Sequence, residues 1–196
     1  MPLNFPKLQS AGFNLAFSYH ADAIIYQEFS EASYELDDVI SDTEISIEEL
    51  VRGGGGESSI TQRLRRALTA IGWKKQNFLI EKRVNNMPTQ SQTHEIDHVK
   101  QFKNGIISLE IEWNNKDPFF DRDLENFNRL HGDGAISVGI IVTRGKSLQE
   151  DMHDILKTWA IDNRINSFDS LEHFGIWTPA LTSLISDRCD SLSPSD

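Results

Sequence analysis

Residues Thr93–Asp117, THEIDHVKQFKNGIISLEIEWNNKD, decide the fold of this chain. Two runs of strand-forming residues flank Asn104-Gly105, a dipeptide that strongly favours a two-residue β-hairpin turn because both central turn positions need a positive φ. With these residues in the loop, Asp97 lies directly across from Glu112. Side chains alternate along a strand, so Glu110 and Glu112 share a face. The sequence therefore predicts three carboxylates on one small patch of sheet.

Such a cluster of like charges needs a compensating group. Directly opposed residues have Cβ atoms roughly 5 Å apart, and like charges at that separation destabilise a sheet. Hard cations such as Mg²⁺ prefer oxygen ligands and usually take one or two carboxylates together with substrate phosphates. A metal site acting on a phosphodiester is one interpretation of the cluster. An alternating strand with a solvent-exposed carboxylate face is the other, and the spacing alone leaves both open.

Length and composition favour one ordinary folded domain. The chain has 196 residues, of which 38% are hydrophobic, enough for a single core. We expect one domain over residues 1–196, with a helical N-terminal part at 1–50, a catalytic core at 57–145 and a helical C-terminal part at 147–190.

Cysteine usage and hydropathy indicate a cytoplasmic protein. Cys189 is the one cysteine, which excludes an internal disulfide and a cysteine-based zinc site. The sequence opens with no charged-then-apolar leader and contains no run of about 18 apolar residues. We therefore expect neither secretion nor a membrane partner.

The charge is unevenly distributed. The net charge of −11 opposes nucleic-acid binding, which depends on Lys and Arg. Residues 51–104, however, carry ten basic and four acidic side chains, whereas both flanking segments are acidic. This basic segment could present a local phosphate-binding surface or be only the solvated face of a helix and its exit. The side chains concerned are Arg63, Arg65, Arg66, Lys74 and Lys75.

Periodicity predicts a mixed sheet between helices, an α/β (α+β) fold. The expected helices are 21–40, broken near residue 30, then 58–71, 119–131, 147–163 and 179–189. The expected strands, besides the central hairpin, are 13–19, 78–84 and the continuous apolar run 135–143. The order strand, helix, strand after residue 105 predicts a parallel pair joined by a right-handed crossover.

The glycine run and Glu57 have mainly structural interpretations, and the two histidines of the hairpin are expected away from Asp97. The glycine run 53–56 lacks the following Lys and Ser or Thr of a P-loop and reads as a hinge. Glu57 stands near a helix N-terminus, where a negative charge is favourable, and could alternatively contribute to the metal site. In the predicted hairpin, His94 and His98 fall on the opposite side of the strand from Asp97.

The residues that follow the hairpin carry a family resemblance. Asp97, then Glu110-Ile111-Glu112, then WNNKDPFFDRDL at 113–124, a helix and a buried strand ending VTRG resemble the type II restriction endonucleases of the BamHI and BglII group. That group belongs to the PD-(D/E)xK nuclease superfamily, and the resemblance covers roughly residues 50–150. Glu112 stands where the superfamily usually has Lys, as in the BamHI type, so the identity of the proton acceptor stays open.

The resemblance implies a restriction endonuclease-like fold and Mg²⁺-dependent hydrolysis of double-stranded DNA at a short palindrome, leaving 5′-phosphate ends. By position, Asp97 and Glu110 would be the metal ligands, and Glu112 would orient or deprotonate the attacking water. Glu81 and Glu57 are the possible supporting carboxylates.

The resemblance also implies partners. A homodimer suits a palindrome, because each subunit reads one half-site, and a cognate DNA methyltransferase would act on the same site. The expected DNA-binding residues are Asn114, Asn115, Lys116, Arg122 and Arg144, with the two arginines as guanine readers. Arg122 could instead pair with a helix neighbour. A repair-type or non-sequence-specific nuclease and a non-catalytic DNA-binding relative remain the alternatives.

Overall fold

The computed structural model describes residues 5–51, 57–112 and 117–164. Contacts divide the chain into two units, Met1–Thr43 with Thr61–Thr143, and Glu44–Ile60 with Arg144–Asp196. The first unit contains the carboxylates of the predicted site.

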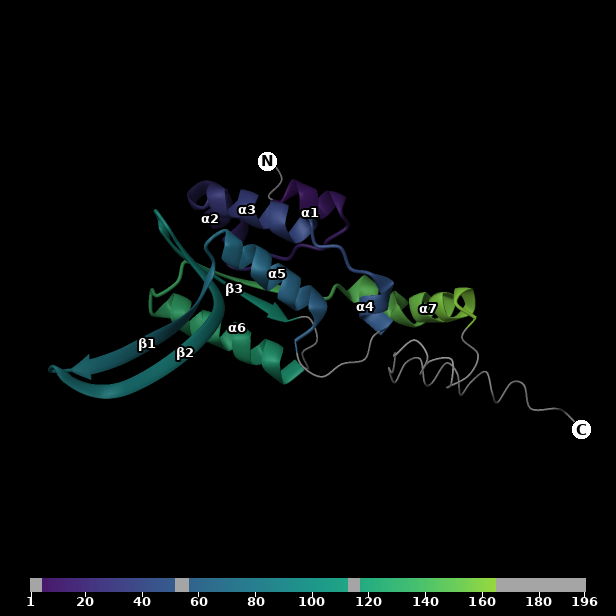
Figure 1. Cartoon of the computed structure of the whole chain (residues 1–196). Helices are drawn as coiled ribbons and strands as arrows, with labels where there is room; N and C mark the ends of the chain where they lie inside the picture. Colours follow the sequence, from purple (N-terminus) through teal and green to yellow (C-terminus); the bar gives the residue numbers. More distant parts are fainter. Residues whose placement is uncertain (1–4, 52–56, 113–116, 165–196) are drawn as a thin grey trace, which may run out of the picture. The chain divides into compact units, whose positions relative to one another are not determined.

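The first unit is built on a mixed four-stranded sheet (Figure 1). The strands β1 (Lys74–Val84), β2 (Met87–Phe102), β3 (Gly105–Glu112) and β4 (Val138–Thr143) lie side by side in chain order. The first two pairs are antiparallel, and β3 and β4 are parallel. Helix α6 (Asp117–Gly132) makes the crossover between the parallel strands, which confirms the predicted strand–helix–strand order.

Helices cover both faces of this sheet, as predicted. On one face α1 (Pro6–Ser10), α2 (Ala21–Glu28), α3 (Ser30–Ser41) and α5 (Ser59–Ala70) bury their apolar sides. That core includes Phe29, Leu36, Leu68, Trp73, Phe102, Ile107 and Leu109. On the other face, α6 packs Phe127 and Leu130 against Phe78, Ile96, Val99 and Ile136. Two separate cores therefore hold the strands that carry the acidic residues.

The turn between β2 and β3 differs from the prediction by one position. Phe102 pairs with Gly105, so the loop residues are Lys103 and Asn104. The Asn104 amide donates hydrogen bonds to the backbone oxygen (3.1 Å) and the carboxylate (2.9 Å) of Glu28 in α2, which holds it outside the ladder. A Cβ added to Gly105 would overlap the side chain of Ser137, so a strand position there requires glycine.

This displacement changes the register and leaves the faces unchanged. His98 pairs with Leu109, so continuing the ladder places Asp97 opposite Glu110 and not opposite Glu112. Relative to the prediction, the residue on β3 opposite each residue of β2 is displaced by two positions. A displacement of two leaves every side chain on its predicted face. The prediction that Asp97 faces Glu112 was therefore wrong, whereas Glu110 and Glu112 do share a face.

A bulge in β2 sits at the same place. On the β1 side, Lys74 pairs with Val99 and Gln76 pairs with Ile96, so β2 has one extra residue between these pairs. A bulge re-aims the side chains on either side of it, and bulges are common beside active sites. As a result, His94 and Asp97 line one cleft, although simple alternation would put them on opposite faces.

Other parts of the chain agree with prediction to differing degrees. The break in the N-terminal helical segment falls at Phe29, between α2 and α3. Residues 13–19 are not a strand. Asn85 and Asn86 form the β1–β2 turn with φ of 52° and 67°, and β2 begins directly after them at Met87. The glycine run 53–56 and the predicted helix 179–189 lie outside the described residues.

The second unit is helical in its described part. Helices α4 (Ile47–Val51) and α7 (Lys146–Asp162) contact each other, and Leu156 and Trp159 of α7 are buried. Throughout the described ranges, no helix is long and apolar enough to cross a bilayer.

Candidate active site

The predicted carboxylates line one cleft between the sheet and α6, with a volume of about 630 Å³. The acidic side chains at this cleft are Glu95, Asp97, Glu110, Glu112 and Asp123, and its basic ones are Arg122 and Arg129. The cleft lies wholly in the first unit. The structure therefore brings together all three residues predicted to be catalytic.

Strand β3 holds Glu110 and Glu112 in place. The strand is central in the sheet, so backbone pairing on both sides restrains it. Ile107 and Leu109 on its other face are fully buried, which fixes the orientation of the strand. Glu110 and Glu112 are each only 7% exposed. These are buried acids on a rigid strand and not the solvent-exposed acidic face of the alternative interpretation.

Asp97 lies at the bulge and is more open. Its side chain is 56% exposed, and one carboxylate oxygen lies 3.3 Å from the Lys75 ammonium, which also pairs with Glu95 at 2.5 Å. Its backbone N–H donates to Oε1 of Glu110 at 3.2 Å. The bulge thus connects two of the predicted catalytic residues directly.

Helix α6 adds a fourth carboxylate, which the sequence reasoning missed. Asp123 is 3% exposed, and its Oδ1 accepts hydrogen bonds from Arg122 at 2.9 Å. Its neighbours Phe127 and Leu130 in the apolar stripe of α6 are buried four and seven residues later. That helical spacing was a usable signal that Asp123 faces inward. Arg122 thus forms an ion pair with a neighbour in its own helix, which is the alternative to guanine reading given for it above.

Burial and mutual repulsion raise the pKa of two of these acids. Desolvation, followed by the charge of Asp97, raises the pKa of Glu110 to about 8. Desolvation also raises the pKa of Glu112 to about 7, helped by a side-chain contact with Asp123, while Arg122 opposes the rise. The cations at this cleft therefore compensate the negative charge of Glu110 and Glu112 only in part.

The donor set fits a hard cation. Within the described residues, Oε2 of Glu112 and Oδ2 of Asp123 are buried and have no hydrogen-bond partner. Carboxylate oxygens are the ligands that Mg²⁺ prefers, and Mg²⁺ usually needs only one or two of them. In the described ranges, no group of three or more His, Cys, Asp or Glu side chains is placed so that it could hold a metal ion by itself. The arrangement suits an ion whose coordination is completed by water and phosphate.

His94 is a second residue whose position the sequence reasoning misjudged. It was expected on the far side of the strand from Asp97, yet it lines the cleft, and its Nδ1 lies 3.0 Å from Oδ1 of Asn126 in α6. The bulge between His94 and Val99 explains the difference. His98, by contrast, is buried opposite Leu109 on the other face, as predicted.

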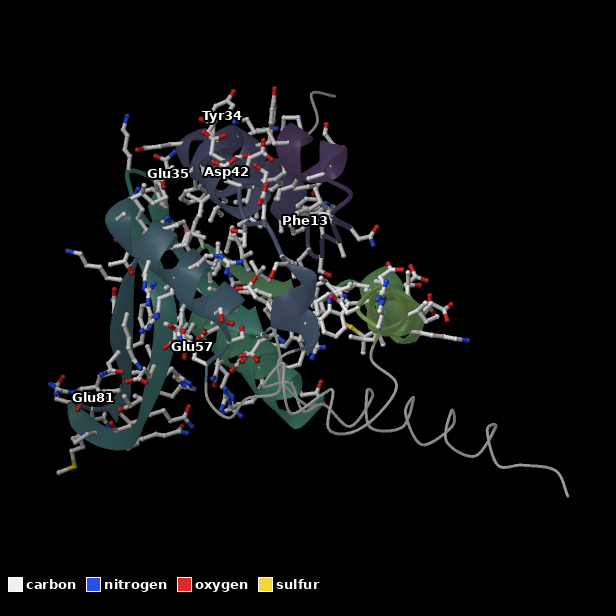
Figure 2. The ribbon with its side chains drawn as sticks, turned by 45° about the vertical axis from the view of Figure 1, so that its right-hand side comes forward. Phe13, Tyr34, Glu35, Asp42, Glu57 and Glu81 are labelled. Carbon is white, nitrogen blue, oxygen red and sulfur yellow. The ribbon has the colours of Figure 1, made fainter. Side chains whose placement is uncertain are left out.

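The remaining predicted residues lie elsewhere. Glu81 lies on the exposed part of β1 (Figure 2). It pairs with Arg83 at 2.9 Å, and the structure does not bring it to the cleft. Glu57 and Arg144 belong to the second unit, and their roles remain predictions. Asn114, Asn115 and Lys116 lie outside the described residues.

Comparison with family models gives a match over most of the chain. The model of the family described as restriction endonuclease BglII/BglIII matches residues 13–174. No curated protein and no solved structure matches the chain. The match covers most of the first unit, including the cleft.

Proposed function

Because this chain belongs to the restriction endonuclease BglII/BglIII family, we propose that it is a type II enzyme that uses Mg²⁺ to hydrolyse double-stranded DNA at a short palindrome, leaving 5′-phosphate ends. The observation that carries the proposal is the convergence of Asp97, Glu110 and Glu112 on one cleft. Buried acids of this kind are costly to ionise without a counter-ion. A divalent cation and a phosphodiester account for them together.

Asp97 and Glu110 would hold the metal ion. The Asp97 backbone N–H donates to one oxygen of Glu110, which restrains the Glu110 carboxylate beside Asp97. When bound, Mg²⁺ supplies charge that polarises the scissile phosphate and stabilises the developing negative charge. Lys75 holds Asp97 by an ion pair and keeps its carboxylate at the cleft.

Glu112 would accept the proton of the attacking water. A general base works best with a pKa near the operating pH, and burial beside Asp123 raises the pKa of Glu112 to about 7. Asp123 would position Glu112, and Arg122 would position Asp123 through its ion pair. This assigns a function to the glutamate that stands at the usual lysine position.

Recognition of the palindrome would come from a homodimer whose subunits each read one half-site. Asn114, Asn115, Lys116 and Arg144 are the proposed DNA contacts, and a cognate methyltransferase would protect the same sequence in the host. Arg122 is a weaker guanine reader than the sequence suggested, since its guanidinium engages Asp123.

Digestion of unmethylated plasmid DNA with and without Mg²⁺ tests this function. We expect discrete fragments with Mg²⁺ only, and run-off sequencing of their ends should locate one palindrome and a 5′-phosphate. A smear would indicate a nuclease without sequence specificity. Binding of DNA in Ca²⁺ with no cleavage in Mg²⁺ would indicate a non-catalytic relative and would overturn the proposal.

A further inference from the structure

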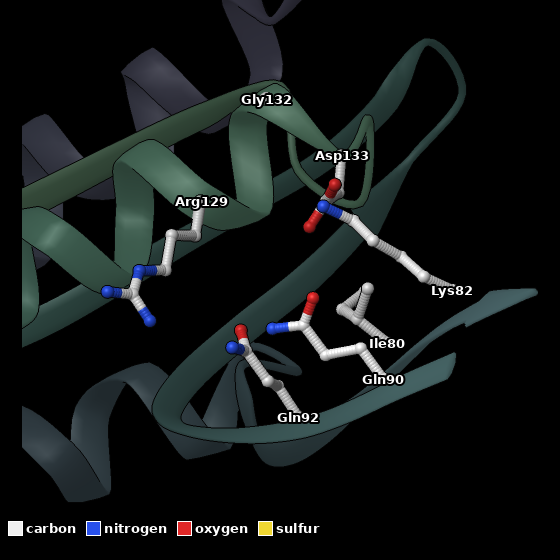
Figure 3. A pocket seen from close by; sticks show the side chains of 7 residues that line it. All are labelled: Ile80, Lys82, Gln90, Gln92, Arg129, Gly132 and Asp133. Carbon is white, nitrogen blue, oxygen red and sulfur yellow. The ribbon is translucent and has the colours of Figure 1, made fainter. Parts of the chain in front are cut away.

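A second hollow, of about 370 Å³, lies between the β1–β2 hairpin and the C-terminal end of α6 (Figure 3). Lys82, Gln90 and Gln92 contribute to it from the hairpin, and Arg129 and Asp133 from α6 and the turn after it. Gln92 and Arg129 also line the catalytic cleft. The two hollows therefore border each other, and we call the outer one the hairpin groove.

The polar groups of the hairpin groove are available to a ligand. The side chains of Lys82, Gln90 and Gln92 make no hydrogen bond or ion pair with any residue that the structure describes. An ammonium and two amides are donors that suit phosphate oxygens. Although the protein as a whole is acidic, this groove is lined by two cations and one carboxylate; Arg129 pairs with Glu125 at 2.7 Å, which makes Lys82 the cation offered to a ligand.

We propose that the hairpin groove binds backbone phosphates of DNA that flanks the cut site; this rests on the proposed nuclease function. Gln90 precedes Asp97 by seven residues on β2, which corresponds to at most about 23 Å along a strand. That length spans about seven base pairs of duplex. The groove therefore lies within about seven base pairs of the proposed cut site, where its ammonium and amide groups can meet phosphate oxygens of the backbone.

The charge pattern of the groove predicts two effects of opposite sign. Lys82 and Asp133 point toward one another across the groove (Figure 3). Removing the Lys82 charge deletes a phosphate contact, whereas removing the Asp133 charge deletes a repulsion. A purely structural role for these two side chains would not give opposite changes in DNA affinity.

Fluorescence anisotropy with a labelled duplex of arbitrary sequence, about 30 base pairs long, tests the proposal in Ca²⁺ across a salt series. We expect Lys82→Gln to weaken binding roughly five- to tenfold at low salt and to reduce the slope of log affinity against log salt by about 1. Asp133→Asn should strengthen binding roughly two- to fivefold.

Two controls separate the groove from general charge effects. Lys103→Gln removes an exposed charge at the other end of β2, and Arg83→Gln removes one from the residue next to Lys82. Both should change affinity by less than about twofold. Losses equal to that of Lys82→Gln would overturn the proposal, as would unchanged binding by Lys82→Gln.

Because phosphate binding does not depend on sequence, this assay reports on the groove whether or not the protein cuts DNA. Absence of plasmid cleavage would refute the nuclease proposal alone. Normal cleavage with unchanged binding by Lys82→Gln would refute the groove alone. On duplexes that carry the mapped cut site, the effect of Lys82→Gln should vanish when the flanking DNA is shortened to about two base pairs.

Discussion

The inner and outer parts of strand β2 contrast sharply, although one continuous strand forms both. Residues 94–102 lie between two apolar cores, and His94, Ile96, His98, Val99 and Phe102 are buried there. Residues 87–93 are exposed apart from half-buried Gln92, and Met87 is 73% exposed. The strand is thus a rigid platform at one end and an open arm at the other.

An acidic residue beside each region shows how the difference in burial changes the environment of a carboxylate. Glu110, beside the inner part, is buried against other carboxylates, and the pKa of its carboxyl rises to about 8. Glu81, beside the outer part, pairs with Arg83 in solvent. Burial between the sheet and the helices therefore separates the environments of these two carboxylates, and strand sequence alone does not.

The largest effect should come from removing a carboxylate of the inner region. We expect Glu110→Gln to reduce the rate of Mg²⁺-dependent cleavage on the order of a thousandfold or more, because it removes a proposed metal ligand. Glu81→Gln, the matched change on the outer hairpin, should leave the rate within about twofold. Single-turnover cleavage of plasmid measures both, and equal rates for the two variants would contradict the assignment of the site.

The next largest difference should be in how much a truncated leucine destabilises the buried region and the outer hairpin. Leu109 is fully buried and Leu79 is 63% exposed. Leu109→Ala should lower the free energy of unfolding by roughly 2–5 kcal/mol through lost burial and a cavity, and Leu79→Ala by less than about 0.5 kcal/mol. Urea unfolding followed by circular dichroism gives both values, and a large loss at Leu79 would mean that the hairpin packs against something in solution.

The apoprotein should lose stability as the pH rises. The pKa of Glu110 is about 8 in the folded chain against an ordinary 4.5, so the folded state holds an extra proton between these values. Stability is therefore highest near the lower pKa and falls as the pH rises toward the upper one. We expect the thermal midpoint to fall by several degrees over this range, at about 2–4 °C per kcal/mol.

Two further measurements sharpen the test of the pH effect. Mg²⁺ should restore much of the lost stability at high pH, because it binds the ionised carboxylates. Glu110→Gln should flatten the dependence on pH, whereas Glu81→Gln should leave it as steep as before. If the thermal midpoint of the unmodified, metal-free protein does not change with pH, the pKa of Glu110 is not raised by folding, which would contradict this prediction.

The smallest expected effect separates two roles for Arg122. Its charge lowers the pKa of Glu112, so Arg122→Gln should raise that pKa and move the acidic limb of the cleavage rate to higher pH. Arg83→Gln, in the outer hairpin, should leave the profile unchanged. An altered recognition sequence with an unaltered profile would instead assign Arg122 to reading guanine.

Much of the architecture follows from local patterns. Apolar periodicity predicted α2 and α3 with their break, α5, α6 and α7, because one face of each helix must be buried. The apolar run before Arg144 predicted a buried strand; the strand is present as β4 at one end of the sheet, mostly half-buried, and its parallel pairing with β3 followed from the intervening helix. The shared face of Glu110 and Glu112 follows from strand alternation and survives the displaced turn.

The sequence by itself thus determined most of the helices and strands, the mixed sheet and the three acids that line one cleft, because these depend on periods of a few residues. The tertiary structure decided the register, since Asn104 is held by Glu28 and Gly105 is pressed against Ser137. It also decided the bulge that turns His94 and Asp97 to one cleft. Contacts between distant segments set these features, and no local pattern encodes them.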